Sequence, residues 1–208
     1  MSLFKSFFGS EKTQYIEFNK KRHRPYDFGC LIAAISFDHS IRVIEDGLLE
    51  MHPIENPEIL SAISSNPLVT QLYVIPYLLS VYTSATLMLV GINATTAKEF
   101  SRGVEWYIKS SPFGPEVGEV MLSRWALFGR ELLNELIAIK EQKMGFENMP
   151  SAKAISEELI NGFNITNLYK HRQIYVNDSD LERLTYAFQS AAALTVKACM
   201  DSNLKIIM

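Results

Sequence analysis

Cysteine is scarce in this sequence, because its 208 residues include only two, Cys30 and Cys199. That scarcity excludes a cysteine-rich zinc site. Both cysteines stand among apolar neighbours, which predicts two buried thiols in a reducing compartment rather than a disulfide. The N-terminal segment has no long apolar core followed by a cleavage site. We therefore expect no secretory signal peptide and a cytoplasmic location.

The signatures of several enzyme classes are also missing. The chain has no Gly-Lys-Ser/Thr phosphate-binding loop and no Gly-x-Ser-x-Gly nucleophile turn. Histidines are few, and no two of them lie three to five residues apart, which argues against a metal clamp on one helix. The histidines are His23, His39, His52 and His171. We expect neither a metal nor a cofactor.

Charge is nearly balanced overall but unevenly placed. The net charge is −3 at pH 7, with +4 in residues 1–25, −6 in residues 26–58 and no charged side chain in residues 59–97. A chain that is acidic overall is a poor general nucleic-acid binder, because affinity for phosphate comes mostly from clustered Lys and Arg. We expect a protein partner and no nucleic acid, while homo-oligomerisation stays open.

The apolar residues recur mostly at spacings of three and four, which predicts helices. The expected helices cover residues 26–46, 57–64, 68–92, 95–108, 116–143, 152–162 and 180–199. Residues 163–176 are ambiguous, since they could extend a helix or break, and residues 173–176 have strand-like composition. The sequence thus predicts an all-α fold: one globular domain of about seven helices around a central apolar helix, spanning residues 26–208. Residues 1–25 are expected to form a basic, aromatic N-terminal arm.

Capping side chains are expected where Ser, Thr or Asn precedes a helical pattern. These are Asn56, Thr95 or Thr96, Ser151, and Ser179 in a capping box with Glu182.

The segment from Leu68 to Ile92 is the most apolar part of the chain. About 20 apolar residues suffice to cross a bilayer, so a membrane span is one interpretation. The segment also carries several hydroxyl side chains and has Pro76 near its middle, which favours a buried central helix that is kinked or broken at Pro76. Tyr73, Tyr77 and Tyr82 need partners for their hydroxyls, so this helix is expected to line a pocket or an interface.

The best candidate for catalysis is Asp38 with His39 and Arg42. A carboxylate, an imidazole and a guanidinium on one helix could perform acid–base chemistry or bind an anion. The interpretation that we favour is an ordinary Asp–Arg pair on a partly exposed helix face. Glu131 and Glu135 also lie four residues apart, but without the Glu-x-x-His motifs of di-metal bundles they indicate a solvated or salt-bridged helix edge.

The basic run of Lys20, Lys21, Arg22 and Arg24 is the candidate partner-binding site. It could be a solvated tail, a site for an acidic protein surface, or a contact with nucleic acid or anionic lipid. Leu3, Phe4, Phe7 and Phe8 add either a weak membrane anchor or an apolar face that docks on the helical body.

These observations favour a non-catalytic helical protein-interaction subunit: an adaptor, a complex component or a toxin-neutralising partner. One alternative is a small helical-pocket enzyme or ligand-binding domain that uses Asp38, His39 and Arg42. The other alternative is a peripheral membrane-associated protein.

Overall fold

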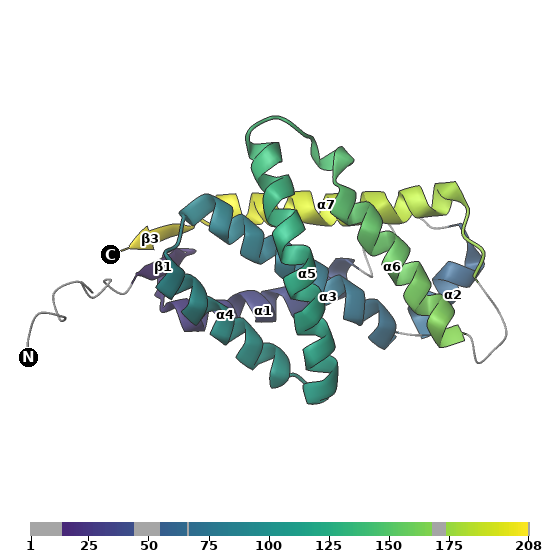
Figure 1. Ribbon diagram of the computed structural model, residues 1–208, viewed down its shortest axis with the longest axis horizontal. Helices are drawn as coiled ribbons and strands as arrows, with labels where there is room; N and C mark the ends of the chain where they lie inside the picture. The colour runs from purple at the N-terminus through teal and green to yellow at the C-terminus, as the bar shows by residue number, and fades with distance from the viewer. Residues whose placement is uncertain (1–13, 44–54, 66, 168–173, 208) are drawn as a thin grey trace, which may run out of the picture.

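The computed structural model describes residues 14–43, 55–65, 67–167 and 174–207 (Figure 1). Within these residues the chain forms seven α-helices, which confirms the all-α prediction. The helices are α1 (Pro25–Arg42), α2 (Pro57–Ser65), α3 (Pro67–Val90), α4 (Ala94–Lys109), α5 (Gly114–Lys140), α6 (Pro150–Asn167) and α7 (Asp178–Asp201). Three short strands and one 3-10 turn complete the fold: β1 (Tyr15–Phe18), β2 (Lys21–His23), β3 (Lys205–Ile207) and η2 (Phe146–Asn148).

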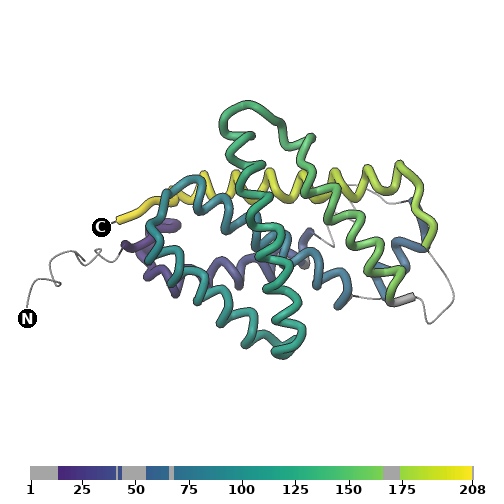
Figure 2. Tube along the Cα trace, in the orientation of Figure 1, coloured from purple at the N-terminus to yellow at the C-terminus, as the bar shows by residue number. Residues whose placement is uncertain are grey.

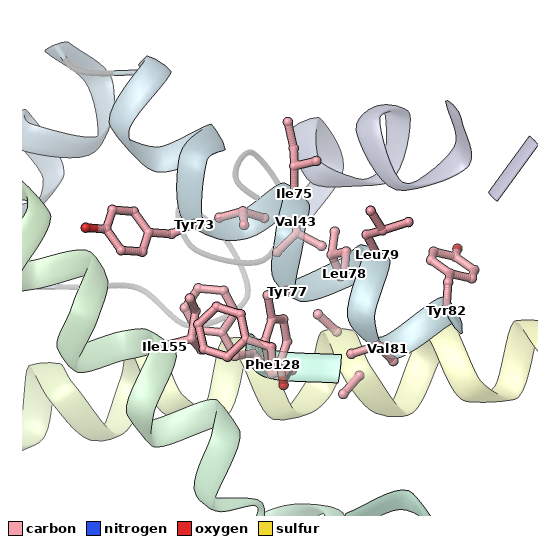
Figure 3. Packing of buried hydrophobic residues seen from close by; sticks show 14 of the residues in the cluster. Val43, Tyr73, Ile75, Tyr77, Leu78, Leu79, Val81, Tyr82, Phe128 and Ile155 are labelled. Atoms are coloured by element: carbon pink, nitrogen blue, oxygen red, sulfur yellow. Dashed lines mark hydrogen bonds between the residues drawn. The ribbon is translucent and has the colours of Figure 1, made fainter. Parts of the chain in front are cut away.

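Helix α3 is the centre of the core, as predicted. It contacts α1, α2, α5, α6 and α7, and every residue from Tyr73 to Thr86 is buried. Figure 3 shows its side chains packed against those of neighbouring helices. Residues Leu68–Val90 are long and apolar enough to cross a membrane, but 78% of the most apolar window lies inside the protein. Burial in the helical core therefore accounts for the apolar composition of this segment.

Pro76 does not break α3. Proline has no N–H, so the carbonyl of Leu72, four residues earlier, loses its partner within the helix. Arg124 from α5 takes that place, because its Nη1 donates to the Leu72 carbonyl oxygen at 2.9 Å. The same guanidinium lies 3.6 Å from the centre of the Tyr73 ring. A neighbouring helix thus supplies the hydrogen bond that the proline removes.

A small antiparallel sheet, which the sequence analysis did not predict, joins the two ends of the described chain. The strand order is β2-β1-β3, and Ile16 at its centre pairs with His23 on one side and Ile206 on the other. Ile16 is fully buried. Figure 2 shows the purple and yellow ends of the chain meeting there. Residues 14–23, expected in the arm, therefore pack on the helical body, while residues 1–13 lie outside the described part.

Helices α1 and α4 pack unusually closely through two glycines. A Cβ atom on Gly29 would lie 2.1 Å from the carbonyl oxygen of Phe100, and one on Gly103 would lie 2.0 Å from that of Tyr26. Further along, the rings of Phe37 and Tyr107 are 5.6 Å apart. The two helices therefore run in the same direction, and their N-termini lie at the same end of the molecule.

The helix caps agree only in part with the prediction. Asn56 caps α2 as expected, since its Oδ1 accepts from the backbone N–H of Glu58 at 2.9 Å. The predicted Thr95 or Thr96 cap of α4 is wrong. Asn93 occupies that place and accepts from the N–H of Thr96 at 2.8 Å.

Two further caps were also misplaced. The cap of α7 is Asn177, which accepts from the N–H of Asp180 at 2.8 Å, so Ser179 lies inside the helix. Ser151 lies inside α6, and Glu135 of α5 binds both its N–H at 2.9 Å and its hydroxyl at 2.6 Å.

The structure describes part of residues 163–176, the segment that the sequence left ambiguous between helix and break. Helix α6 continues through residue 167, and residues 174–177 have no regular secondary structure, so the strand-like composition of residues 174–176 does not produce a strand. Residues 168–173, and the expected end of the first helix at residue 46, lie outside the described part of the chain.

Candidate functional site

Asp38 and Arg42 form a pair on the surface of α1. The shortest distance between the carboxylate and the guanidinium is 3.5 Å, and the two side chains are 72% and 70% exposed. Exposed pairs at this spacing contribute only a few tenths of a kcal/mol. Their geometry is that of an ordinary surface ion pair.

His39 points the other way, into the contact between α1 and α3. Its Nδ1 lies 3.2 Å from the hydroxyl of Tyr82. Burial lowers the pKa of His39, and nearby Arg42 lowers it further, while Asp38 opposes the change. Burial also raises the pKa of Tyr82 to about 12. Near neutral pH both partners are uncharged, so His39 is a half-buried hydrogen-bonding group between α1 and α3, while Asp38 and Arg42 pair with each other on the surface.

The other tyrosines of α3 also find partners inside the protein. The Tyr77 hydroxyl donates to the carbonyl oxygen of Phe188 at 3.3 Å, and the Tyr73 ring lies under Arg124. None of these tyrosines lines the three cavities that we describe, of about 380, 480 and 230 Å³. The hydroxyls of Tyr77 and Tyr82 thus have partners inside the protein, and the cavity of about 230 Å³ that reaches α3 is lined there by Thr83, Ser84 and Leu87.

The basic run lies on a well-defined β-hairpin. Phe18 pairs with Lys21, which leaves a two-residue turn of Asn19 and Lys20 with φ of 50° and 63°. Positive φ at both positions is the signature of the tight turn that best matches the twist of paired strands. The Asn19 N–H donates to the carbonyl oxygen of Ser202 at 3.0 Å, which fixes the turn to the end of α7.

The cations of this hairpin are exposed and have no acidic partner among the described residues. They are Lys20, Lys21, Arg22 and Arg24, here called the basic hairpin. The Arg22 guanidinium lies 3.8 Å from the centre of the Tyr15 ring, a cation–π contact that leaves its charge uncompensated. The nearby carboxylate of Glu17 is bound by Lys205 at 2.8 Å.

A cavity of about 480 Å³ opens beside the basic hairpin, between the N-termini of α1 and α4. Its wall includes Tyr15, Arg24, Asp27, Asn93 and Glu99. The Glu99 carboxylate is bound by Arg102 at 2.7 Å, which reduces its effect on the cavity. Arg24 and the partial positive charge of the two helix N-termini are set against the carboxylates of Asp27 and Glu99, so the charge of this recess is mixed.

The remaining acid–base candidates have structural roles. Glu135 caps α6 through Ser151. Burial raises the pKa of Glu135, the Ser151 hydrogen bonds lower it, and Glu131 raises it further. Both cysteines are free thiols, and burial raises their pKa values, that of Cys199 to about 12. No three His, Cys, Asp or Glu side chains in the described part of the chain gather in a way that could hold a metal ion.

A second polar cavity, of about 380 Å³, lies between η2, α6 and α7. Sequence reasoning missed it, because its residues come from three separate segments. The only available signal was the polar spacing of Asp178, Glu182, Thr185 and Gln189 along one side of the last helix.

Comparison with protein-family models, with curated proteins and with solved structures found no match to this chain.

Proposed function

We propose that this chain is a non-catalytic helical interaction subunit that binds an acidic surface of another protein through the basic hairpin. The observation that carries the proposal is the group of four exposed cations without an acidic partner in the described residues, held on an ordered hairpin. Clustered charge of one sign attracts a partner of opposite charge and aligns it. Because the hairpin is already held in shape, little conformational entropy is lost on binding.

The neighbouring cavity supports the same interpretation. Arg24 belongs both to the basic hairpin and to the wall of the 480 Å³ recess. An acidic side chain of the partner would pair there with the Arg24 guanidinium, while the wall carboxylates of Asp27 and Glu99 would restrict which acidic groups fit. We expect the hairpin cations to set the association rate and the recess to add specificity.

The test is quantitative capture of partners from the native lysate with matched charge variants. The hairpin variant is Lys20→Glu/Lys21→Glu. The control is Arg130→Glu/Lys197→Glu, which makes the same change in net charge at exposed positions of α5 and α7. We expect one stoichiometric protein to bind the wild type and the control, and to bind the hairpin variant at least about tenfold more weakly. Added salt should weaken the complex.

Equal recovery with both variants would contradict the assignment to the basic hairpin. Recovery that nuclease treatment abolishes would point to nucleic acid instead. Binding to anionic vesicles with no protein partner would favour the membrane-associated alternative. Circular dichroism of each variant checks that a loss of binding is not a loss of folding.

A further inference from the structure

The cavity of about 230 Å³ lies where α3, α4 and α5 come together, and it shares no wall residue with the recess beside the basic hairpin. Its wall includes the rings of Phe100 and Trp125 and the side chain of Leu87. Gly129 is also in the wall, and a Cβ atom added there would meet no other part of the described chain within 4 Å. Apolar cavities of about 150 Å³ hold a benzene ring, so this cavity has room for one aromatic side chain.

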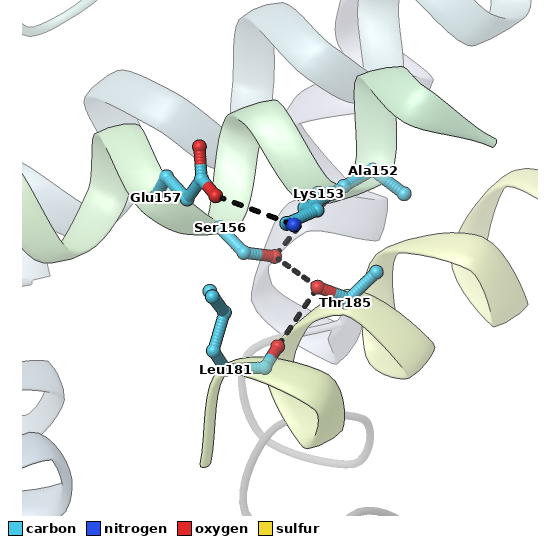
Figure 4. A network of polar contacts seen from close by, with 6 residues as sticks. All are labelled: Ala152, Lys153, Ser156, Glu157, Leu181 and Thr185. Carbon is cyan, nitrogen blue, oxygen red and sulfur yellow. Dashed lines mark hydrogen bonds and ion pairs between the residues drawn. The ribbon is translucent and has the colours of Figure 1, made fainter. Parts of the chain in front are cut away.

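Hydroxyl groups in this wall are already hydrogen-bonded within the protein. Thr83 Oγ1 accepts from the Trp125 indole N–H at 3.2 Å, and the Ser84 hydroxyl donates to a carbonyl oxygen of α5 at 3.1 Å. Hydroxyls have a similar role between α6 and α7, where the oxygens of Thr185 and Ser156 lie 3.5 Å apart (Figure 4). Because these wall groups are satisfied by one another, the interior of the cavity favours an apolar occupant.

The described chain begins close to this cavity, at Gln14. The Gln14 Oε1 atom accepts from the backbone N–H of Asn93 at 3.1 Å and from the Thr96 hydroxyl at 2.9 Å. Ala97, the next residue of α4, lines the cavity, and Phe100 follows about 6 Å further along the helix axis than Thr96. The residues that precede Gln14 are therefore attached to the protein at the edge of the cavity.

The segment before Gln14 carries several large apolar side chains, which are Leu3, Phe4, Phe7 and Phe8. Phe8 is six residues from Gln14, and an extended chain of that length reaches about 20 Å. A tether this short gives its side chains an effective concentration on the order of mM at a nearby site. The segment is therefore favoured over an aromatic side chain of another protein as the occupant of the cavity.

We propose that this cavity binds the side chain of Phe7 or Phe8 from the N-terminal segment of the same chain. The ring packs between Trp125 and Phe100, and its burial stabilises the docked segment. Docking also withdraws these phenylalanines from solvent and from any membrane surface. The proposal depends neither on the basic hairpin nor on its partner.

Acrylamide quenching of Trp125 fluorescence tests the proposal in the full chain. The sequence has two tryptophans, and Trp106→Phe removes the other one, which is 56% exposed. Trp125 is partly exposed and lines the cavity, so a docked ring shields it from the quencher. In this background we expect Phe7→Ser/Phe8→Ser to raise the quenching constant of Trp125 about twofold, because the indole loses its cover.

The matched control is Leu3→Ser/Phe4→Ser, which removes two large apolar side chains from the same segment. The control should leave the quenching constant of Trp125 unchanged, because the cavity holds one ring and the nearer phenylalanines occupy it. The same rise in the control as in Phe7→Ser/Phe8→Ser would overturn the assignment to those two residues.

Filling the cavity from its own wall gives an independent check. Gly129→Leu places an apolar side chain in the open space and should displace the docked ring. Phe7→Ser/Phe8→Ser should then have no further effect on the quenching of Trp125. Far-ultraviolet circular dichroism shows whether Gly129→Leu keeps its helices. The N-terminal variants change no residue of the helical body, so they test the proposal even if this variant does not fold.

Three results would overturn the proposal. Equal quenching of Trp125 with and without Phe7→Ser/Phe8→Ser would show that neither ring covers it. A difference that disappears on dilution would assign the ring to a second copy of the chain. Binding to anionic vesicles that Phe7→Ser/Phe8→Ser abolishes would show that the rings are free to enter lipid and are not held in the cavity.

Discussion

Replacing Arg124 should show how the central helix tolerates a proline. In the wild type its guanidinium donates to the Leu72 carbonyl oxygen that Pro76 leaves without a partner, and stacks on Tyr73. A hydrogen bond from a charged group contributes about 1.5–3 kcal/mol and a cation–π contact about 0.5–1 kcal/mol. Because Arg124 is partly exposed, we expect Arg124→Met to lower the free energy of unfolding by about 2 kcal/mol.

The decisive measurement is a double-mutant cycle with Pro76→Ala. Alanine restores the N–H that can bond Leu72 within the helix, so Arg124 then contributes little beyond its stacking. The cost of Arg124→Met should fall to about 0.5–1 kcal/mol in that background, a coupling of about 1–1.5 kcal/mol. Urea unfolding followed by far-ultraviolet circular dichroism gives all four values. Additive effects within about 0.5 kcal/mol would refute the idea that Arg124 replaces the missing hydrogen bond.

Four further predictions concern packing and titration. Gly103→Ala should destabilise the fold by about 2–4 kcal/mol, because its Cβ would lie 2.0 Å from a carbonyl oxygen of α1. In urea titrations of the same series, Gly129→Ala, with no atom within 4 Å of the added Cβ, should instead stabilise by about 0.5–1 kcal/mol. Burial raises the pKa of Glu135 above 4.5, so the folded protein holds this proton more tightly than the unfolded chain does. The stabilisation that results is lost as pH rises through the raised pKa. Glu135→Gln should therefore flatten the plot of unfolding free energy against pH in this range. Because the pKa of His39 is lowered in the folded protein, the free energy of unfolding should fall as pH drops below 6.5. Arg42 contributes to that lowering, so NMR titration of Arg42→Met should show a higher pKa for His39.

Long, periodic helices were predictable because their pattern is local. The sheet was not, since β1 pairs with a strand near the other end of the chain. The alternation of Tyr15, Ile16, Glu17 and Phe18 is a strand signal, and Asn19 suits a turn with positive φ. Four alternating residues are a weak strand signal next to a pronounced run of basic residues. Strand β3 has only three residues and shows no strand pattern of its own.

Two of the predicted helix caps were wrong because contacts with residues distant in sequence occupy the expected capping side chains. Ser151 is a good capping residue by type, yet its own N–H and hydroxyl bind the carboxylate of Glu135, which comes from the preceding helix. Thr96 is likewise occupied, because its hydroxyl donates to the Gln14 side chain at 2.9 Å. Asn93 can then cap α4 alone. Among the misplaced caps, a residue distant in sequence satisfies the helix end only at α6, whereas the caps of α4 and α7 are the nearby Asn93 and Asn177.

The candidate sites show the same division between local and distant information. The charge of the basic run was readable from the sequence, but the neighbouring cavity lies between the N-termini of α1 and α4, two helices that pack closely through Gly29 and Gly103. Asp38 and His39 are adjacent in sequence, which suggested one site. On a helix adjacent residues point about 100° apart, and here that angle separates solvent from core.

The composition of α3 alone did not decide between a membrane span and a buried helix, and the contacts of its hydroxyl groups show what the composition does not contain. Ser80 and Ser84 each donate to a carbonyl oxygen of α5, those of Trp125 and Gly129, at 3.1 Å in both cases. The Trp125 indole N–H in turn donates to the Thr83 hydroxyl at 3.2 Å. These hydrogen bonds join α3 to α5. The two serine donors on α3 are one helical turn apart, and so are the two carbonyl acceptors on α5. Hydroxyls at this spacing on an apolar helix therefore predict a tightly packed partner helix, and identifying that partner required the fold.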